Sequence, residues 1–130
     1  MSASRSATPL ARVRGLGPAG NVGGHWREER FTAVALLLLS LWLIFSLIML
    51  PALDRDTLVE WLRAPAAAVP MALFVIATFR HALDGMKVFV DDYVHTEGNL
   101  VVAHFALKMA AVAGVALCLF ALAKIAFGAA

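Results

Sequence analysis

The chain has 130 residues, of which 62% are hydrophobic and 15% charged, and its formal net charge at pH 7 is +2. This apolar fraction is above that of ordinary soluble domains and indicates a membrane protein. The length leaves no room for a separate soluble catalytic domain. A single cysteine, Cys118, excludes a disulfide, a zinc site or an iron–sulfur cluster built within this chain. Nothing in the sequence resembles a nucleic-acid-binding module.

Residues 1–30 are expected to form a cytoplasmic segment that ends in a collar at the membrane surface. Residues 1–27 are rich in Arg, Ser, Gly and Ala and contain no acidic residue, a composition typical of mitochondrial transit peptides. We interpret the segment instead as a retained extension of a bacterial protein. The run from His25 to Arg30 contains the Trp and Arg residues that anchor helices at a membrane–water boundary.

The first membrane-spanning helix is expected at residues 31–53. This stretch is uncharged and long enough to cross a hydrocarbon core of about 30 Å. The following linker, residues 54–64, alternates charged with apolar residues. It is expected on the periplasmic side, where it can form a short amphipathic helix lying in the membrane interface.

The second spanning helix is expected at residues 65–90, with Pro65 in its first turn. The uncharged run from Pro65 to Phe79 would give only about 22 Å of helix at about 1.5 Å per residue, which is too short to span. The helix must therefore continue through four ionisable residues at membrane depth. They are Arg80, His81, Asp84 and Lys87.

A short cytoplasmic loop, residues 91–98, leads to a third spanning helix at residues 99–127. Gly114 and its neighbouring alanines give this helix a small-residue surface for close helix packing. The N-terminal segment carries more Arg residues than the linker at 54–64, which places the N-terminus in the cytoplasm. The predicted fold is an all-α membrane protein with three transmembrane helices and a periplasmic C-terminus.

The end of the second helix carries residues that could bind a haem. At about 100° per residue, Asp84, Gly85 and Asp92 lie on the same face as His81. A neutral imidazole is a common axial ligand of haem iron, and Gly85, one turn away, lets a flat macrocycle approach the backbone. The alternative for His81 is a hydrogen bond to a neighbouring helix. His104 is a weaker candidate for the second ligand, which is expected from another subunit.

Arg80 has two possible partners. It can bind a haem propionate through two parallel hydrogen bonds, or it can pair with Asp84 one turn later and lower the energetic cost of both buried charges. Lys87 is expected to extend to the lipid headgroups. Tyr93 can hydrogen-bond a quinone carbonyl, while Asp92 can orient the phenol or relay protons. The alternative is an aromatic-belt tyrosine beside an acidic helix end.

This pattern resembles the hydrophobic membrane anchor of succinate dehydrogenase, the D-type subunit of respiratory complex II. The residues that carry the resemblance are Arg80-His81, Gly85 and Asp92-Tyr93, together with Gly15-Leu16-Gly17, Gly24-His25-Trp26 and Arg30-Phe31-Thr32-Ala33 upstream. With the layout of three spans, it covers nearly all of residues 15–127. Asp84 and the long glycine-rich N-terminus are not part of the family pattern.

The resemblance implies an anchor in the bacterial inner membrane that pairs with a second, cytochrome b556-type anchor subunit. Together the two would hold the flavoprotein and iron–sulfur subunits, where succinate is oxidised. By the family pattern, His81 resembles the axial ligand of haem b, and Tyr93 and Asp92 resemble the ubiquinone-binding pair. Arg30 stands where the family has a basic residue near the haem propionates or the lipid headgroups. Two alternatives stay open: a haem-free structural or assembly protein of the membrane, and the anchor of a quinol:fumarate reductase.

Overall fold

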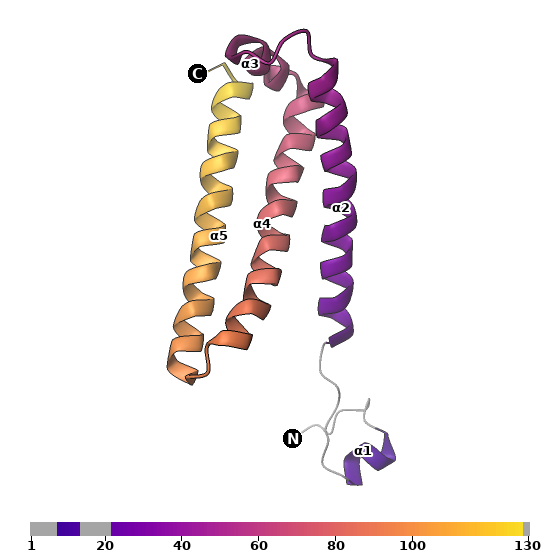
Figure 1. Ribbon diagram of the computed structural model, residues 1–130, viewed down its shortest axis with the longest axis vertical. Helices are drawn as coiled ribbons and strands as arrows, with labels where there is room; N and C mark the ends of the chain where they lie inside the picture. The colour runs from indigo at the N-terminus through magenta and orange to yellow at the C-terminus, as the bar shows by residue number, and fades with distance from the viewer. Residues whose placement is uncertain (1–7, 14–21, 129–130) are drawn as a thin grey trace.

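The computed structural model describes residues 8–13 and 22–128, and all regular secondary structure in these ranges is helical (Figure 1). The helices are α1 (Pro9–Val13), α2 (Val22–Met49), α3 (Arg55–Arg63), α4 (Pro65–Tyr93) and α5 (Glu97–Ala126). The predicted all-α class is confirmed. Residues 1–7 and 14–21 of the predicted N-terminal segment, with Gly15-Leu16-Gly17, lie outside the described residues, as do the side chains of His25 and Trp26.

Three helices are long and apolar enough to cross a membrane, which confirms the predicted number of spans. The candidate spans are Arg27–Met49, Pro65–Tyr93 and Glu97–Ala126. The first ends at Met49 and not at Leu53, because Pro51 has no N–H to donate and disfavours a helical conformation for the residue before it. The side of the membrane on which each terminus lies stays a prediction.

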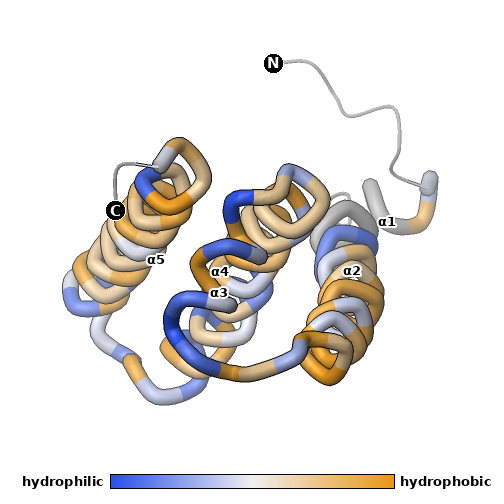
Figure 2. Tube along the Cα trace, turned by 90° about the horizontal axis from the view of Figure 1, so that it is seen from above, coloured by the Kyte–Doolittle hydropathy of each residue, from blue (hydrophilic) through white to orange (hydrophobic). Residues whose placement is uncertain are grey.

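The three long helices form a row with α4 in the middle (Figure 2). Within the described residues, α4 packs on both α2 and α5, whereas α2 and α5 do not pack on each other. Such a row has two broad faces that the described part of the chain leaves uncovered. Most large apolar side chains are therefore exposed, and the described hydrophobic residues that are buried are Ala67 and Leu122. A membrane protein can satisfy these faces with lipid or with the helices of a partner.

The linker forms the predicted short helix, α3, at one end of the row (Figure 1). Asp54 caps it by accepting a 2.8 Å hydrogen bond from the Thr57 N–H, and this bond lowers the pKa of the Asp54 carboxyl below its ordinary value. The ring of Trp61 stacks on Trp42 of α2 with 5.8 Å between ring centroids. The linker helix is thus joined to the row by an aromatic contact.

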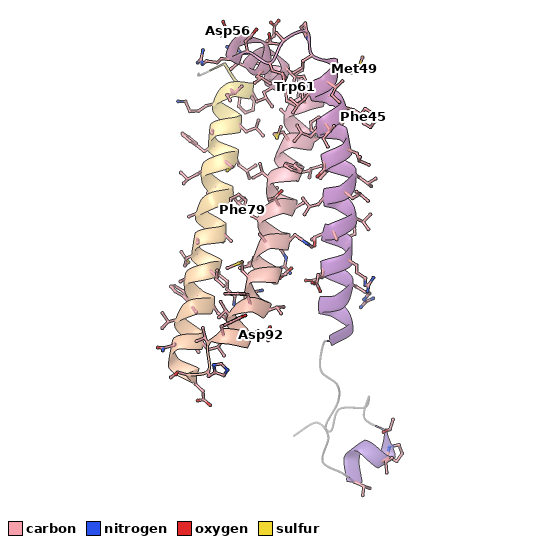
Figure 3. All side chains as sticks on the ribbon, viewed as in Figure 1. Phe45, Met49, Asp56, Trp61, Phe79 and Asp92 are labelled. Atoms are coloured by element: carbon pink, nitrogen blue, oxygen red, sulfur yellow. The ribbon has the colours of Figure 1, made fainter. Side chains whose placement is uncertain are left out.

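Helices α4 and α5 approach closely where a glycine faces an aromatic ring. A Cβ atom added to Gly114 would overlap the ring of Phe79, which projects from α4 towards α5 (Figure 3). Glycine at 114 therefore has a packing role between the two helices. This contact confirms the small-residue surface predicted for the third span.

Candidate functional site

Helix α4 is continuous from Pro65 to Tyr93, so it carries all four ionisable residues predicted at membrane depth. It also carries Asp92 and Tyr93 in its last turn, at the end of the row opposite α3 (Figure 3). The prediction that the helix passes through Arg80 and His81 without a break is confirmed. The predicted haem-binding and quinone-binding residues of the second span thus lie on one helix.

His81 is half-buried and contacts α2. Its Nδ1 atom lies 3.1 Å from Oγ1 of Thr32, and the Thr32 hydroxyl donates a 2.9 Å hydrogen bond to the carbonyl oxygen of Glu29. The hydrogen bond to a neighbouring helix, considered above as the alternative to ligation, is therefore present. It uses only one of the two ring nitrogens, so it is compatible with iron binding through Nε2.

Arg80 lies at the centre of a network of charges that joins α4 to α2. Its guanidinium donates to Asp84 Oδ1 at 2.6 Å and to Glu28 Oε2 at 2.7 Å. Lys87 Nζ lies 3.4 Å from the same Asp84 oxygen. Two cations and two carboxylates make the network neutral, as buried charges require. The predicted Arg80–Asp84 pair is confirmed, and the network extends to another helix.

Asp84 is the most deeply buried of these groups, with 1% of its surface exposed. Its second oxygen, Oδ2, has no hydrogen-bond partner within the described part of the chain. The prediction that Lys87 extends to the headgroups is wrong, because its ammonium is attracted to the Asp84 carboxylate one turn earlier. The role of Asp84 was open from the sequence, and in the structure this carboxylate is the shared acceptor of two cations.

Gly85 is exposed on α4, and a Cβ atom added there would meet nothing within 4 Å among the described residues. Packing inside the chain therefore does not require a glycine at this position, in contrast to Gly114. Helical geometry puts Gly85 about 40° round the axis from His81, one turn further along. The backbone beside His81 is thus open to a flat group. Of the two ring nitrogens of His81, only Nδ1 has a hydrogen-bond partner among the described residues, and a histidine of this kind next to bare backbone fits a haem.

Tyr93 is the last residue of α4 and is 70% exposed. Its ring stacks on Phe89 one turn earlier, with 4.5 Å between the ring centroids. It lies about 18 Å along the axis and about 120° round it from His81. Asp92 is also exposed, and its side chain leaves the helix about 100° away from that of Tyr93. Both predicted quinone residues therefore lie at a different level of α4 from His81, but only Tyr93 lies on a different face, since Asp92 is about 20° round the axis from His81.

Arg30 and His104 are not brought to His81. Arg30 is exposed on α2 and, two residues before Thr32, leaves that helix on nearly the opposite side. Nε2 of His104 lies 2.9 Å from Asp91 Oδ1, so this histidine contacts α4 from α5, whereas His81 faces α2. The two histidines are on different sides of α4 and do not form a ligand pair within the chain.

An apolar groove of about 440 Å³ lies between α4 and α5. Arg80 is the one predicted site residue that lines it, beside aliphatic and aromatic side chains such as Phe79 and Val112. Neither His81 nor Tyr93 belongs to the lining. The groove therefore shares only Arg80 with the predicted haem-binding residues and none with the predicted quinone-binding residues.

Thr32 and Glu28 were not predicted as partners of the site. Both lie on α2, about one turn apart, and contact His81 and Arg80 respectively. The available signal was the presence of a polar and an acidic residue four positions apart at the start of an apolar span. Their partners lie about fifty residues away in sequence, and spacing alone does not identify such contacts.

Comparison with known proteins gives a family match over residues 4–123, to the family described as succinate dehydrogenase/fumarate reductase transmembrane subunit. The chain is also similar to bacterial proteins named succinate dehydrogenase hydrophobic membrane anchor subunit. The protein from Rickettsia bellii is 31% identical over 85 residues, which are 65% of this chain and 68% of that protein. The protein from Rickettsia conorii is 29% identical over 86 residues, 65% and 68% of the two chains. The protein from Paracoccus denitrificans is 30% identical over 89 residues, 68% and 69% of the two chains.

Proposed function

Because the chain belongs to the succinate dehydrogenase/fumarate reductase transmembrane subunit family, we propose that it is the membrane-anchor subunit of a succinate:ubiquinone oxidoreductase. The resemblance to the D-type anchor is confirmed by the family match and by the names of the relatives. Bacterial relatives and three apolar helices make the chain a multi-pass protein of the bacterial inner membrane. The docking, haem and quinone roles below are parts of the proposal.

In this role the chain pairs with a second membrane-anchor subunit of cytochrome b type. The observation that supports the pairing is the open row of α2, α4 and α5, whose broad apolar faces are left uncovered by residues 8–13 and 22–128. Helices of a partner laid against one face would complete a bundle around His81. The flavoprotein and iron–sulfur subunits would dock at the cytoplasmic surface, on the side where Tyr93 ends α4.

His81 is proposed as the ligand that this chain gives to haem b. The observation that carries the proposal is its geometry: Nδ1 is engaged by Thr32, the other nitrogen is available, and the neighbouring Gly85 leaves bare backbone. A b-type haem held there would accept and release single electrons. The second ligand comes from the partner subunit, because His104 faces a different side of α4.

Arg80 and Arg30 are both proposed to lie near the haem propionates, Arg80 because of its contacts in the structure and Arg30 because of the family pattern. One end of the Arg80 guanidinium can leave Glu28, whose carboxylate is largely exposed, and bind a haem propionate, while the other end stays bound to the buried carboxylate of Asp84. An arginine suits this double role because its planar fork presents separate donors. Arg30 rests on the family pattern alone, since it leaves α2 on the side away from Thr32.

Tyr93 and Asp92 are proposed to bind ubiquinone at the end of α4. The Tyr93 phenol is exposed and its ring is held against Phe89, so a hydrogen bond from the hydroxyl to a quinone carbonyl needs little rearrangement. Asp92 is exposed at the same level, where a carboxylate can pass protons from water to the reduced quinone. The two side chains diverge, so they would contact the quinone region from different sides.

The experiment that tests the haem proposal is a dithionite-reduced-minus-oxidised absorption spectrum of the purified complex. The comparison is between the wild type, His81→Ala and His95→Ala, with subunit assembly confirmed in each. His95 lies in the exposed turn between α4 and α5 and serves as the matched control. We expect a b-type signal that weakens or shifts in His81→Ala and is unchanged in His95→Ala. A haem signal that His81→Ala leaves unchanged would mean that another residue is the ligand.

A haem-free structural or assembly role is the second candidate, and one observation favours it. Glu28, Arg80 and Asp84 pair their charges across α2 and α4, as a purely structural membrane protein would need. An assembled wild-type complex without any b-type signal would select this role. A complex with haem that reduces fumarate faster than it oxidises succinate would instead select the quinol:fumarate reductase anchor.

A further inference from the structure

We propose that Thr32 is a positioning residue for the haem ligand: through its hydroxyl it fixes the tautomer and the ring orientation of His81. This inference rests on the proposed role of His81 and names a residue on a different helix. It begins from two hydrogen bonds that share one oxygen. Oγ1 of Thr32 lies 2.9 Å from the carbonyl oxygen of Glu29 and 3.1 Å from Nδ1 of His81.

The position of the hydrogens follows from counting donors. A threonine hydroxyl has one hydrogen and two lone pairs, and a carbonyl oxygen can only accept. The Glu29 carbonyl therefore takes the hydroxyl hydrogen of Thr32, which is the usual bond of a helical threonine to its own preceding turn. Oγ1 then has only lone pairs left for His81, so Nδ1 must carry a hydrogen. In a neutral imidazole protonated at Nδ1, the lone pair is on Nε2.

This tautomer is the one that an axial iron ligand bound through Nε2 needs. A ligand histidine whose other N–H is hydrogen-bonded is held in orientation and becomes a stronger base. The hydroxyl accepts more strongly because it also donates to a carbonyl, since hydrogen bonds in a chain polarise one another. Thr32 and the Glu29 carbonyl that accepts its hydroxyl hydrogen both belong to α2. The orientation of His81 is therefore set by a neighbouring helix.

The second contact between the same helices reinforces this placement. Glu28 and Arg80 form a 2.7 Å ion pair beside the Thr32–His81 contact. Glu28 lies about one turn before Thr32 on α2, and Arg80 is adjacent to His81 on α4. Two neighbouring contacts fix the rotation of α4 against α2 better than one does. The imidazole is thereby presented on the side of α4 that carries Gly85.

The test compares Thr32→Val, Thr32→Ser and Thr78→Val in the purified complex. Valine keeps the shape of threonine and removes the acceptor, whereas serine keeps the hydroxyl. Thr78 is the matched control, since its hydroxyl makes the same type of bond, 2.7 Å to the Phe74 carbonyl in its own helix, one turn from His81. Thr32→Ala, which removes the same oxygen with less bulk, is the second variant should valine disturb assembly. The readouts are the haem midpoint potential and the retention of haem against excess apomyoglobin.

We expect Thr32→Val to raise the midpoint potential, because a less basic imidazole stabilises the ferric state less, and to weaken haem retention by about 10- to 100-fold. Thr32→Ser and Thr78→Val should match the wild type. If both Thr32→Val and Thr32→Ala keep the wild-type potential and haem retention while His81→Ala loses the haem, the positioning role is overturned and the ligand role stands. If the wild type holds no haem, or if His81→Ala leaves the haem unchanged, both proposals fail together.

Discussion

At the scale of single residues, the local contacts of the site were predictable and the contacts between helices were not. The Arg80–Asp84 pair followed from their spacing of one turn, and the structure has it at 2.6 Å. Thr32 and Glu28 escaped prediction because they meet His81 and Arg80 through the packing of α2 on α4. A sequence gives the angle of a side chain on its own helix, but the rotation of one apolar helix against another depends on tertiary packing.

Asp84 gives a prediction at this scale, because removing it leaves two cations beside a buried space. Removing one partner of a buried ion pair typically lowers the free energy of unfolding by about 3–5 kcal/mol. For Asp84→Ala we expect a loss of about 3 kcal/mol, because the side chain of Arg80 is 38% exposed and stays partly hydrated. The measurement is the thermal unfolding of the detergent-solubilised complex.

The matched control for Asp84 is Asp56→Ala, which removes the carboxylate of an exposed pair with Arg55 and should leave the unfolding temperature unchanged. The double variant Arg80→Leu with Asp84→Leu should regain much of the lost stability, since it removes both charges together. An Asp84→Ala complex as stable as the wild type would mean that the network contributes nothing to the fold.

At the scale of elements, hydropathy predicted which segments are helices, but it marks where a segment enters and leaves the membrane and not where the helix itself begins and ends. A run of uncharged residues marks the depth of the membrane, whereas a helix continues as long as its backbone hydrogen bonds do. This is why α2 begins at Val22, before the predicted collar at residues 25–30, and why α4 continues to Tyr93. The end of α2 at Met49 follows from Pro51, a local signal that outweighs the apolar character of residues 52 and 53.

The packing of α4 on α5 leads to a prediction with a control on the same helix. Gly114→Leu should destabilise the pair of helices, because even a Cβ at this position overlaps the ring of Phe79. Overpacking of this kind typically costs about 1–3 kcal/mol. Gly98→Leu, near the start of the same helix, should not, since a side chain there meets nothing within 4 Å in the described chain. Thermal unfolding of the assembled complex would separate the two, and equal effects would contradict the role given to Gly114.

At the scale of the whole molecule, the row of helices could not be predicted from hydropathy. The apolar residues of α2 and α5 surround each helix, so the sequence indicates no preferred face for packing. The row also explains why so little of the described chain is buried, since of the three long helices only α4 packs against both of the others. Polar contacts then decide the arrangement on the side of α2, where Thr32 and Glu28 meet α4. On the proposed function, a second anchor subunit would cover one of the faces that the described helices leave open and would supply the other haem ligand from there.

The quinone proposal depends on the orientation of the chain in the membrane. If the N-terminus is cytoplasmic, α3 lies on the periplasmic side and Tyr93 lies on the cytoplasmic side, next to the subunits that deliver electrons. In a Cys118→Ser background, Glu60→Cys in α3 should react with a membrane-impermeant maleimide added to intact cells. His95→Cys, beyond the end of α4, should react only after the cells are opened. The reverse pattern would put Tyr93 and Asp92 on the periplasmic side, away from the iron–sulfur subunit, and would exclude them from a quinone-reduction site fed from the cytoplasm.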